Sequence, residues 1–270
     1  MLNISQLQVI KSKVLKDRGL DLDSYKDSFI LRRVDLQMRL AECNSHMQYL
    51  RLLDKDPEEY NRLFNALSIN VTEFFRDMVM FEIFKEIIFP NLAYNKIQRK
   101  GRIIRIWSAG CASGEEAYSI AISIAEAIKD RDRNFIVSIY GTDIDEAAMK
   151  QAKLGIYPKE RLKNVNKQIL KRYFNHKDGK YQVKDEIKSM IRFNKQDLIH
   201  DKHPTHFDII FCRNVFIYFS RKQQDKLLNI FHSSLNSDGF LILGKTETIP
   251  IDLHEKFYFV DPGEKIYRKI

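Results

Sequence analysis

Residues 110–114, Gly-Cys-Ala-Ser-Gly, are the most informative string in this chain, because they leave little side-chain volume between a predicted strand and a predicted helix. Such a turn lets a ligand approach the backbone at a strand tip, where open α/β sheets bind small molecules. Glu115 and Glu116 follow in the first helical turn and would repel a phosphate. The charge therefore favours a ligand that carries an amine or a sulfonium, although two acids also stabilise a helix N-terminus by the ordinary dipole effect.

Two further predicted strand tips carry polar side chains. Asp143 follows a β-rich strand, and Arg213 with Asn214 follows the fully apolar strand 207–212. An acid at the second strand tip can accept hydrogen bonds from both hydroxyls of a ribose, and Asp197-Leu198 is spaced to meet an adenine edge. The alternative for Asp143 is that it caps the following helix, a role that Asp145 also fits.

A string of unusual composition, Asn70-Val-Thr-Glu-Phe-Phe-Arg76, precedes the first of these strands. Two adjacent aromatic residues are flanked by polar groups within seven positions. By itself the string has an ordinary explanation, in which Asn70 or Thr72 caps a helix and the two phenylalanines belong to the core.

The apolar pattern predicts the elements that position these residues. Residues 1–92 show helical spacing and predict an all-helical N-terminal domain, and the polar stretch 93–102 predicts a linker. From residue 103 to 270, strands alternate with helices, which predicts an α/β domain with a largely parallel, doubly wound sheet. A helix from about Met78 is expected to stop at Pro90.

The alternation is interrupted at about 158–196. Short strands over 179–183 and 190–193, with a turn at Asp178-Gly179, predict a small antiparallel β-subdomain inserted in the sheet domain. Residues 257–260 and 266–268 predict a hairpin at the end of the chain.

The net charge of +9 is concentrated in one segment, since positions 150–205 hold 15 basic and 6 acidic residues. This excess indicates either a surface for an acidic partner or a solvated lysine-rich face. Cys43, Cys111 and Cys212 are far apart, which predicts no disulfide framework and suits a reducing cytoplasm. We expect no signal peptide and no insertion into a membrane.

Four strings in order resemble the chemotaxis receptor (CheR-type) methyltransferases. The strings are Asn70–Arg76, Trp107–Ser119, Gly141–Asp145 and Phe207–Phe219. The resemblance implies a bacterial enzyme that uses S-adenosylmethionine (SAM) to methylate glutamate side chains of chemoreceptors and releases S-adenosylhomocysteine (SAH). It also implies a class I methyltransferase domain with an inserted β-subdomain, after a helical domain that recognises the receptor and completes the cofactor site.

The resemblance also implies functional residues. Its cofactor contacts, together with the glycine of the turn, are Asn70, Thr72, Arg76, Gly110, Glu116, Asp143, Asp197, Leu198, Arg213 and Asn214. Either Glu115 or Glu116 could face the methionine amine, and we assign Glu116. Arg76 would bind the methionine carboxylate.

We expect Arg213 and Tyr218 to act in catalysis by orienting the substrate carboxylate, although Tyr218 could simply pack with its aromatic neighbours. The residues Arg32, Arg33 and Arg39 resemble the basic helix with which the family faces the acidic helical bundle of a receptor. An ordinary solvated helix face is the alternative. The loop 176–180 is short, which favours recognition without a receptor tail peptide.

No metal is expected, because the spacing of His200, His203 and His206 gives no regular helical face and methyl transfer needs none. We expect no nucleic-acid partner, because the basic segment lacks interleaved aromatic residues and the chain lacks an Asn/Asp-Pro-Pro-aromatic string. We also expect the protein to be a monomer. Two alternatives stay open: carboxyl methylation of an acidic protein outside chemotaxis, and a non-catalytic module that senses SAM.

Overall fold

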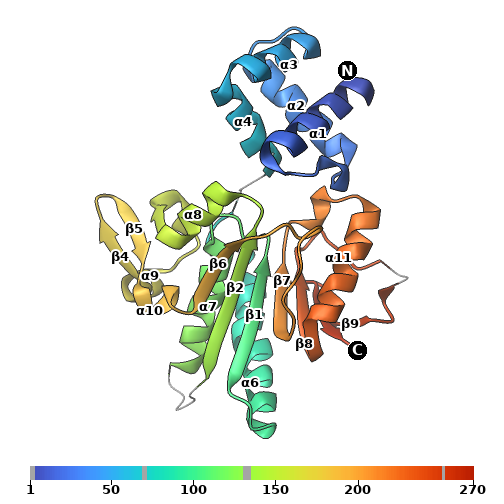
Figure 1. Ribbon diagram of the computed structural model, residues 1–270. Coiled ribbons are helices and arrows are strands. Elements are labelled where there is room, and N and C mark those ends of the chain that lie inside the picture. The colour runs from blue at the N-terminus through green and yellow to red at the C-terminus, as the bar shows by residue number, and fades with distance from the viewer. Residues whose placement is uncertain (1–3, 69–71, 130–134, 251–252) are drawn as a thin grey trace. The chain divides into compact units, whose positions relative to one another are not determined.

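The computed structural model describes residues 4–68, 72–129, 135–250 and 253–270 (Figure 1). The chain divides into two compact units. The first unit comprises residues 1–70 and 218–224, and the second comprises residues 71–217 and 225–270. Within the described ranges, no helix has the length and apolar character needed to cross a membrane.

The first unit is helical, as predicted. Its helices are α1 (Ile4–Arg18), the 3₁₀ turn η1 (Leu22–Ser24), α2 (Asp27–Leu40), α3 (His46–Lys55) and α4 (Pro57–Ser68). The Ser45 hydroxyl caps α3 by accepting the Gln48 N–H at 3.2 Å, and Pro57 opens α4, where its missing N–H has no helical partner to lose. The residues Val14, Ile30, Val34 and Leu63 are fully buried and form its core.

A separate stretch of chain completes this unit. The Lys26 N–H donates to the Tyr218 carbonyl at 2.9 Å, and the Ser220 N–H donates to the Ser24 carbonyl at 3.0 Å. These two bonds hold residues 218–220 alongside the segment between α1 and α2.

The second unit is built on a seven-stranded sheet in the order β6-β2-β1-β7-β8-β10-β9. Its strands are β1 (Ile103–Ala109), β2 (Ile136–Asp143), β6 (Ile191–Lys195), β7 (Phe207–Cys212), β8 (Leu235–Leu243), β9 (Phe257–Asp261) and β10 (Ile266–Lys269). The first five in the sheet are parallel, and β10 runs antiparallel between β8 and β9. The predicted doubly wound sheet and terminal hairpin are both confirmed.

Helices pack on both faces of this sheet. They include α7 (Glu115–Ile128), α8 (Glu146–Leu154) and α11 (Arg221–Ser234). Every residue of β7 is buried, as a strand covered on both faces requires. Phe211 packs edge-on against Phe84 at 5.3 Å, whereas Trp107 of β1 packs against Phe231 of α11 at 5.4 Å.

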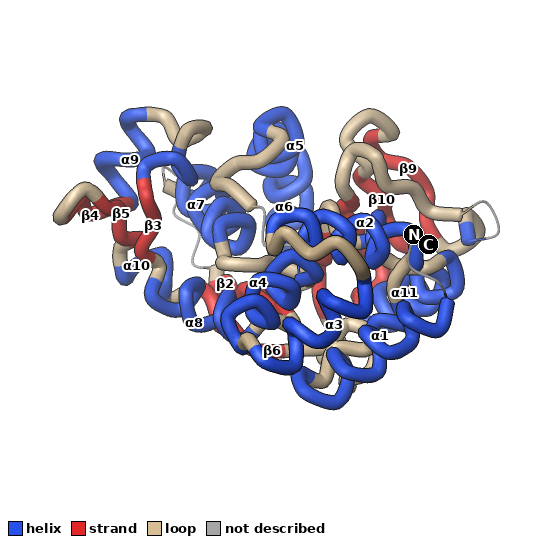
Figure 2. The backbone as a smooth tube through the Cα atoms, turned by 90° about the horizontal axis from the view of Figure 1, so that it is seen from above, coloured by secondary structure: helices blue, strands red, loops and turns tan. Residues whose placement is uncertain are grey.

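The predicted small antiparallel β-subdomain is confirmed, but one of its predicted strands belongs to the main sheet. The subdomain is a three-stranded antiparallel sheet of β3 (Ile156–Pro158), β5 (Lys180–Val183) and β4 (Phe174–Lys177), accompanied by η3 (Lys159–Leu162), α9 (Lys167–Tyr173) and α10 (Asp185–Lys188) (Figure 2). The turn at Asp178-Gly179 is where we predicted it. The predicted strand 190–193 is instead β6, which pairs parallel with β2 in the main sheet, with Ile191 and Phe193 buried and Arg192 exposed.

The predicted helix stop at Pro90 and linker 93–102 also differ from the structure. Helix α5 (Met78–Ile83) continues through the π-helical turn η2 (Phe84–Ile88) into α6 (Phe89–Gln98). The Phe89 N–H donates to the carbonyl of Phe84, five residues back, and Pro90 lies at the start of α6, where it need not donate. Residues 71–92 therefore belong to the sheet unit, and the compact units divide at residue 70.

Candidate functional site

The small-residue turn after β1 is fixed by close packing. The N–H groups of Gly110 and Cys111 both donate to the Thr142 carbonyl, at 2.8 and 2.9 Å. Gly110 has φ +77°, and a Cβ there would lie 2.6 Å from Val215 Cγ2. Any larger residue at Gly110 would therefore strain the turn and push Val215 away.

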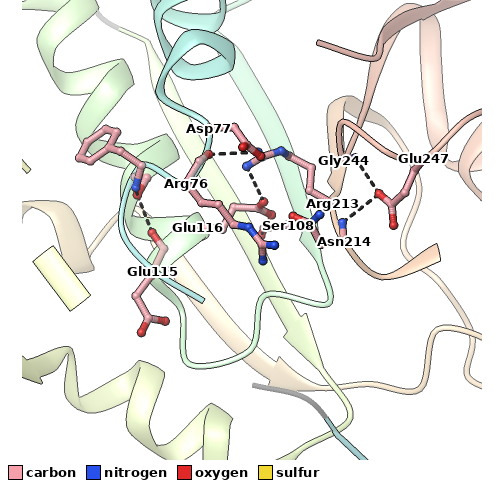
Figure 3. A network of polar contacts seen from close by, with 11 residues as sticks. Arg76, Asp77, Ser108, Glu115, Glu116, Arg213, Asn214, Gly244 and Glu247 are labelled. Carbon is pink, nitrogen blue, oxygen red and sulfur yellow. Dashed lines mark hydrogen bonds and ion pairs between the residues drawn. The ribbon is translucent and has the colours of Figure 1, made fainter. Parts of the chain in front are cut away.

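Glu116 projects from the first turn of α7 into a network of charges (Figure 3). Its carboxylate accepts from the Ser108 hydroxyl at 2.7 Å and from the Arg213 guanidinium at 3.3 Å. Burial raises the pKa of Glu116, whereas Arg213, the Ser108 hydroxyl and the charge of Arg76 lower it. Ser108, inside β1, was not predicted, because a serine in a buried strand gives no sign of its partner.

Arg213 joins this network to the segment before α5. Its guanidinium donates to Asp77 at 2.5 Å and to the Arg76 carbonyl at 3.0 Å, and it lies over the Phe81 ring at 5.6 Å from the centroid. The side chain is only 2% exposed. Asp77 was not predicted, although its φ of +59° marks a fixed bend directly before the helix.

Glu115 points away from this network (Figure 3). Its carboxylate accepts from the Ser113 hydroxyl at 2.8 Å, and one oxygen lies 3.8 Å from Arg161. Burial raises the pKa of Glu115, and the Ser113 hydroxyl and Arg161 oppose this rise. The two adjacent acids thus have separate surroundings, and only Glu116 pairs with Arg213.

Asp143 ends β2 and is nearly buried. Its two oxygens accept from the Ala112 N–H at 2.8 Å and the Asp145 N–H at 3.0 Å. Burial raises the pKa of Asp143 to about 6, although these hydrogen bonds lower it. Asp145 caps α8 by accepting from the N–H groups of Ala147 and Ala148. The helix-capping role considered for Asp143 therefore belongs to Asp145.

Three acids border the small-residue turn: Glu115 and Glu116 follow it in the first turn of α7, and Asp143 accepts from the Ala112 N–H at 2.8 Å. Burial raises the pKa of Cys111 well above its ordinary value, and the charges of Asp143, Glu116 and Glu115 raise it further. All three acids are therefore close enough to the turn to act on the same group. A site with this concentration of carboxylates favours a ligand with positive charge and hydroxyl donors.

Asp197 and Leu198 follow β6. The Asp197 carboxylate accepts from the Ile199 N–H at 2.7 Å and contacts the His200 ring nitrogen at 3.0 Å, so it organises its own turn. Leu198 is buried, and its carbonyl contacts His203 at 2.9 Å. An adenine contact at this turn stays a prediction.

Asn214 lies at the tip of β7 with φ +61°. Its N–H donates at 2.8 Å to Glu247, a buried carboxylate that sequence reasoning missed. Glu247 lies in a short polar stretch without periodicity, so no signal in the sequence distinguishes it.

The described part of the string 70–76 is anchored by the sheet unit. Arg161 donates to the Thr72 carbonyl, and its own carbonyl accepts the Phe74 N–H at 3.1 Å. The Phe75 N–H donates to the Ser119 hydroxyl at 2.9 Å. Asn70 lies outside the described residues.

The remaining predicted residues belong to the first unit. Arg32 and Arg39 of α2 are exposed, whereas Arg33 is half-buried with its guanidinium 5.7 Å from the Phe29 ring centroid. The Tyr218 ring packs at 5.0 Å from the Phe29 ring. A joint role of Tyr218 with Arg213 stays a prediction.

Two family models match the chain. The CheR methyltransferase SAM binding domain covers residues 70–266, and the CheR methyltransferase all-alpha domain covers residues 5–68. The chain belongs to the CheR methyltransferase family. The boundary between the two CheR domains agrees with the division of the structure at residue 70, and the resemblance found in the sequence is confirmed.

Curated relatives support the same family. A chemotaxis protein methyltransferase of Borreliella burgdorferi is 36% identical over 241 residues, which cover 87% of this chain and 85% of that relative. Chemotaxis protein methyltransferase 2 of Pseudomonas aeruginosa is 32% identical over 266 residues, covering 96% of this chain and 91% of that relative. The Escherichia coli chemotaxis protein methyltransferase is 31% identical over 266 residues, covering 96% and 88%.

The residues of this CheR family member fit SAM. SAM carries an amine and ribose hydroxyls, and carboxylates such as those of Glu116 and Asp143 accept hydrogen bonds from donors of this kind. Among the described residues, the buried Arg213 Nε has no hydrogen-bond partner, so the site keeps donor capacity. Within the same residues, no group of three His, Cys, Asp or Glu side chains could hold a metal ion.

Proposed function

We propose that this protein transfers the methyl group of SAM to glutamate side chains of chemoreceptors in the bacterial cytoplasm, producing glutamyl methyl esters and SAH. The position of Glu116 directly after the glycine turn and the contact of Asp143 with the Ala112 N–H of that turn carry the cofactor assignment. The curated relatives are named chemotaxis protein methyltransferases, which supports methyl transfer in chemotaxis as the setting.

Each group of the cofactor has a candidate partner. Glu116 is proposed to bind the methionine amine, Arg76 the methionine carboxylate and Asp143 the two ribose hydroxyls. Leu198 and Asp197 are proposed to lie at the adenine. When bound, SAM supplies a methyl group on a positively charged sulfur, which an acidic site accommodates.

The substrate needs little chemical activation. A glutamate side chain has a reference pKa near 4.3 and is ionised at neutral pH, so no general base is required. The protein's contribution is alignment of the carboxylate oxygen with the methyl carbon, for which about 7–11 kcal/mol is available in well-oriented systems.

Arg213 suits a positioning role for the substrate carboxylate. A bare guanidinium would hold the carboxylate tightly and reduce its nucleophilicity. Here Asp77 and Glu116 already offset the charge of Arg213, at 2.5 and 3.3 Å. We therefore propose that Arg213 orients the incoming carboxylate weakly, together with the hydroxyl of Tyr218.

Arg32 and Arg39 support an acidic protein as the partner. Both are exposed on α2, and basic side chains there complement the acidic methylation face of a receptor bundle. Arg33 contributes less to this surface, because part of it is buried against Phe29.

The test is to incubate the protein with methyl-labelled SAM and cytoplasmic receptor fragments from the same organism. We expect label on the receptor that alkali releases as methanol, and no label on a fragment whose mapped glutamates are changed to alanine. Absence of label despite SAH binding would contradict the proposal. Label on a different acidic protein would indicate carboxyl methylation outside chemotaxis, and binding without transfer to any protein would indicate a SAM sensor.

A further inference from the structure

Glu247 is a buried carboxylate that the proposed reaction does not use directly. It is 3% exposed and lies shortly after the end of β8, in the stretch Lys245-Thr246-Glu247-Thr248. Burial raises the pKa of Glu247, and the groups that oppose this rise are backbone N–H groups of residues 244, 214, 217 and 216. An acid held by backbone amides serves to fix the chain segments that supply them.

The hydrogen bonds of Glu247 join two strand tips. Oε2 accepts from the Gly244 N–H at 2.6 Å and from the Asn214 N–H at 2.8 Å (Figure 3). Oε1 accepts from the Ile217 N–H at 3.3 Å. The carboxylate thus bridges the end of β8 to the segment 214–217 that follows β7.

Gly244 shows how closely this contact is built. A Cβ on Gly244 would lie 2.7 Å from Glu247 Oε2 and 2.8 Å from the Asn214 nitrogen. Only glycine therefore lets the carboxylate and the Asn214 backbone approach each other here. Asn214 has a positive φ of +61°. This left-handed backbone conformation is unfavourable for a residue other than glycine, so contacts with the surrounding chain must stabilise it.

The segment fixed by Glu247 begins beside Arg213. The Arg213 side chain is held on its other side by Asp77 and Glu116. Side-chain contacts thus fix the guanidinium, whereas Glu247 fixes the backbone from which Arg213 and Asn214 project.

We propose that Glu247 is a positioning residue for the methyl transfer: by holding the backbone of residues 214–217, it sets the direction of Arg213 and Asn214 toward the reacting groups. This inference rests on the proposed function. The contacts of Glu247 are with backbone N–H groups of residues 214, 217 and 244, and in this proposal it acts only through the segment that they belong to.

The test is the variant Glu247→Gln, whose amide presents an NH₂ group to backbone N–H donors in place of one accepting oxygen. We expect amide hydrogen exchange of Asn214, Ile217 and Gly244 to accelerate by about tenfold or more. We expect kcat to fall by about 10- to 100-fold, since small misplacements near reacting groups have effects of this size. The Kd for SAH should rise by less than about tenfold, because Glu116 and Asp143 keep their own contacts.

Asp208→Asn is the matched control. Asp208 is also 3% exposed and lies on β7, near the opposite end of the strand, where it accepts from the Arg105 N–H at 2.9 Å and pairs with Lys96 at 2.7 Å. Replacing the Asp208 carboxylate by an amide should lower the melting temperature. It should leave kcat near the wild-type value when kcat is measured at a temperature where Asp208→Asn and Glu247→Gln are both folded. An equal loss of kcat in both variants would overturn the proposal, because it would indicate a general effect of destabilisation.

Glu247→Asp keeps a carboxylate and should recover part of the lost kcat. If Glu247→Gln does not fold, the same comparison is made with Glu247→Asp, for which faster exchange of the three amides and a lower kcat are expected. Wild-type kcat or unchanged exchange in the variants overturns the positioning role. If the wild-type protein methylates no acidic protein, that result contradicts the proposed function. The amide exchange rates and the SAH affinities of the Glu247 variants would then decide by themselves whether Glu247 holds the segment 214–217.

Discussion

The guanidinium of Arg213 and the carboxylate of Glu116 lie 3.3 Å apart, with the arginine side chain 2% and the glutamate side chain 13% exposed. Asp77 contacts the same guanidinium at 2.5 Å. Two carboxylates therefore share one arginine, and the charge of Arg76 also acts on Glu116. Arg213 therefore holds the Glu116 carboxylate that we propose as the partner of the cofactor amine.

Glu116→Gln tests this assignment. The amide keeps the size of the side chain but removes the charge, and a hydrogen bond to a charged group contributes about 1.5–3 kcal/mol. We expect the Kd for SAH, measured by calorimetry, to rise by about 10- to 150-fold. Glu115→Gln is the matched control and should stay within about threefold of the wild type, because Glu115 faces Ser113 and Arg161. If Glu115→Gln instead raises the Kd for SAH more than Glu116→Gln does, the amine would be assigned to Glu115.

Local sequence patterns sufficed to predict the main sheet and the turn between its first strand and the following helix. Alternation of strands and helices gave the doubly wound unit, and small residues before two acids marked the turn at 110–114. Both Glu116 and Asp143 stand at the ends of regular elements, so their positions follow from the element boundaries.

Other features depend on partners that are distant in sequence. Glu247 binds backbone N–H groups about 30 positions away, and backbone donors leave no trace in side-chain patterns. The short strand at 191–195 has an alternation that fits either sheet, and only pairing with β2 decides between them. Pro90 was predicted to stop a helix because the π-helical turn before it has no signature in the sequence.

Asp143 should make cofactor binding depend on pH. Burial raises the pKa of Asp143 from 3.8 to about 6 in the ligand-free protein. If the ionised carboxylate accepts the ribose hydroxyls, affinity for SAH should fall as the pH drops through about 6 and should be level well above it. Calorimetry across this range measures the effect, and Asp143→Asn should bind more weakly and lose this dependence. Affinity that rises on acidification would contradict the assignment.

The contribution of Asp143 to the stability of the fold changes with pH in the direction opposite to its contribution to SAH affinity. Because its pKa is higher in the folded state, the stability linked to its protonation is fully present below about 3.8 and is lost as the pH rises through about 6. Ligand-free protein should therefore lose less stability over this interval when Asp143 is replaced by asparagine. Melting temperatures of both proteins across the same buffers provide the comparison.

Arg213→Lys should separate charge from geometry. Lysine keeps one positive charge but lacks the planar fork that contacts Asp77 and the Arg76 carbonyl together. We expect kcat for receptor methylation to fall by about tenfold or more, since misaligned groups lose alignment energy. Arg172→Lys is the control, because Arg172 pairs with Glu126 on a more exposed surface, and its turnover should not change. Unchanged turnover in Arg213→Lys would remove Arg213 from the mechanism.

Tyr218→Phe tests the hydroxyl that we assign to substrate orientation. Phenylalanine preserves the ring that packs 5.0 Å from Phe29, so the variant should fold normally. We expect kcat to fall by about 3- to 10-fold with little change in SAH affinity, because the loss of one hydrogen bond corresponds to about 0.5–1.5 kcal/mol. Tyr60→Phe, at a buried tyrosine of the same unit, is the control, and steady-state kinetics of both variants with the receptor fragment distinguish a role in the reaction from a role in packing.

Charge reversal on α2 tests recognition of the acidic partner. Arg32→Glu with Arg39→Glu should raise the KM for the receptor fragment by about tenfold at low salt, and the difference should shrink as salt screens the surface charges. The Kd for SAH should not change, because these residues are proposed to face the partner and not the cofactor. Arg51→Glu, an exposed arginine on α3, is the control for net charge. If Arg51→Glu raises KM as much as the double variant, the effect belongs to overall charge, and α2 is not the receptor-facing surface.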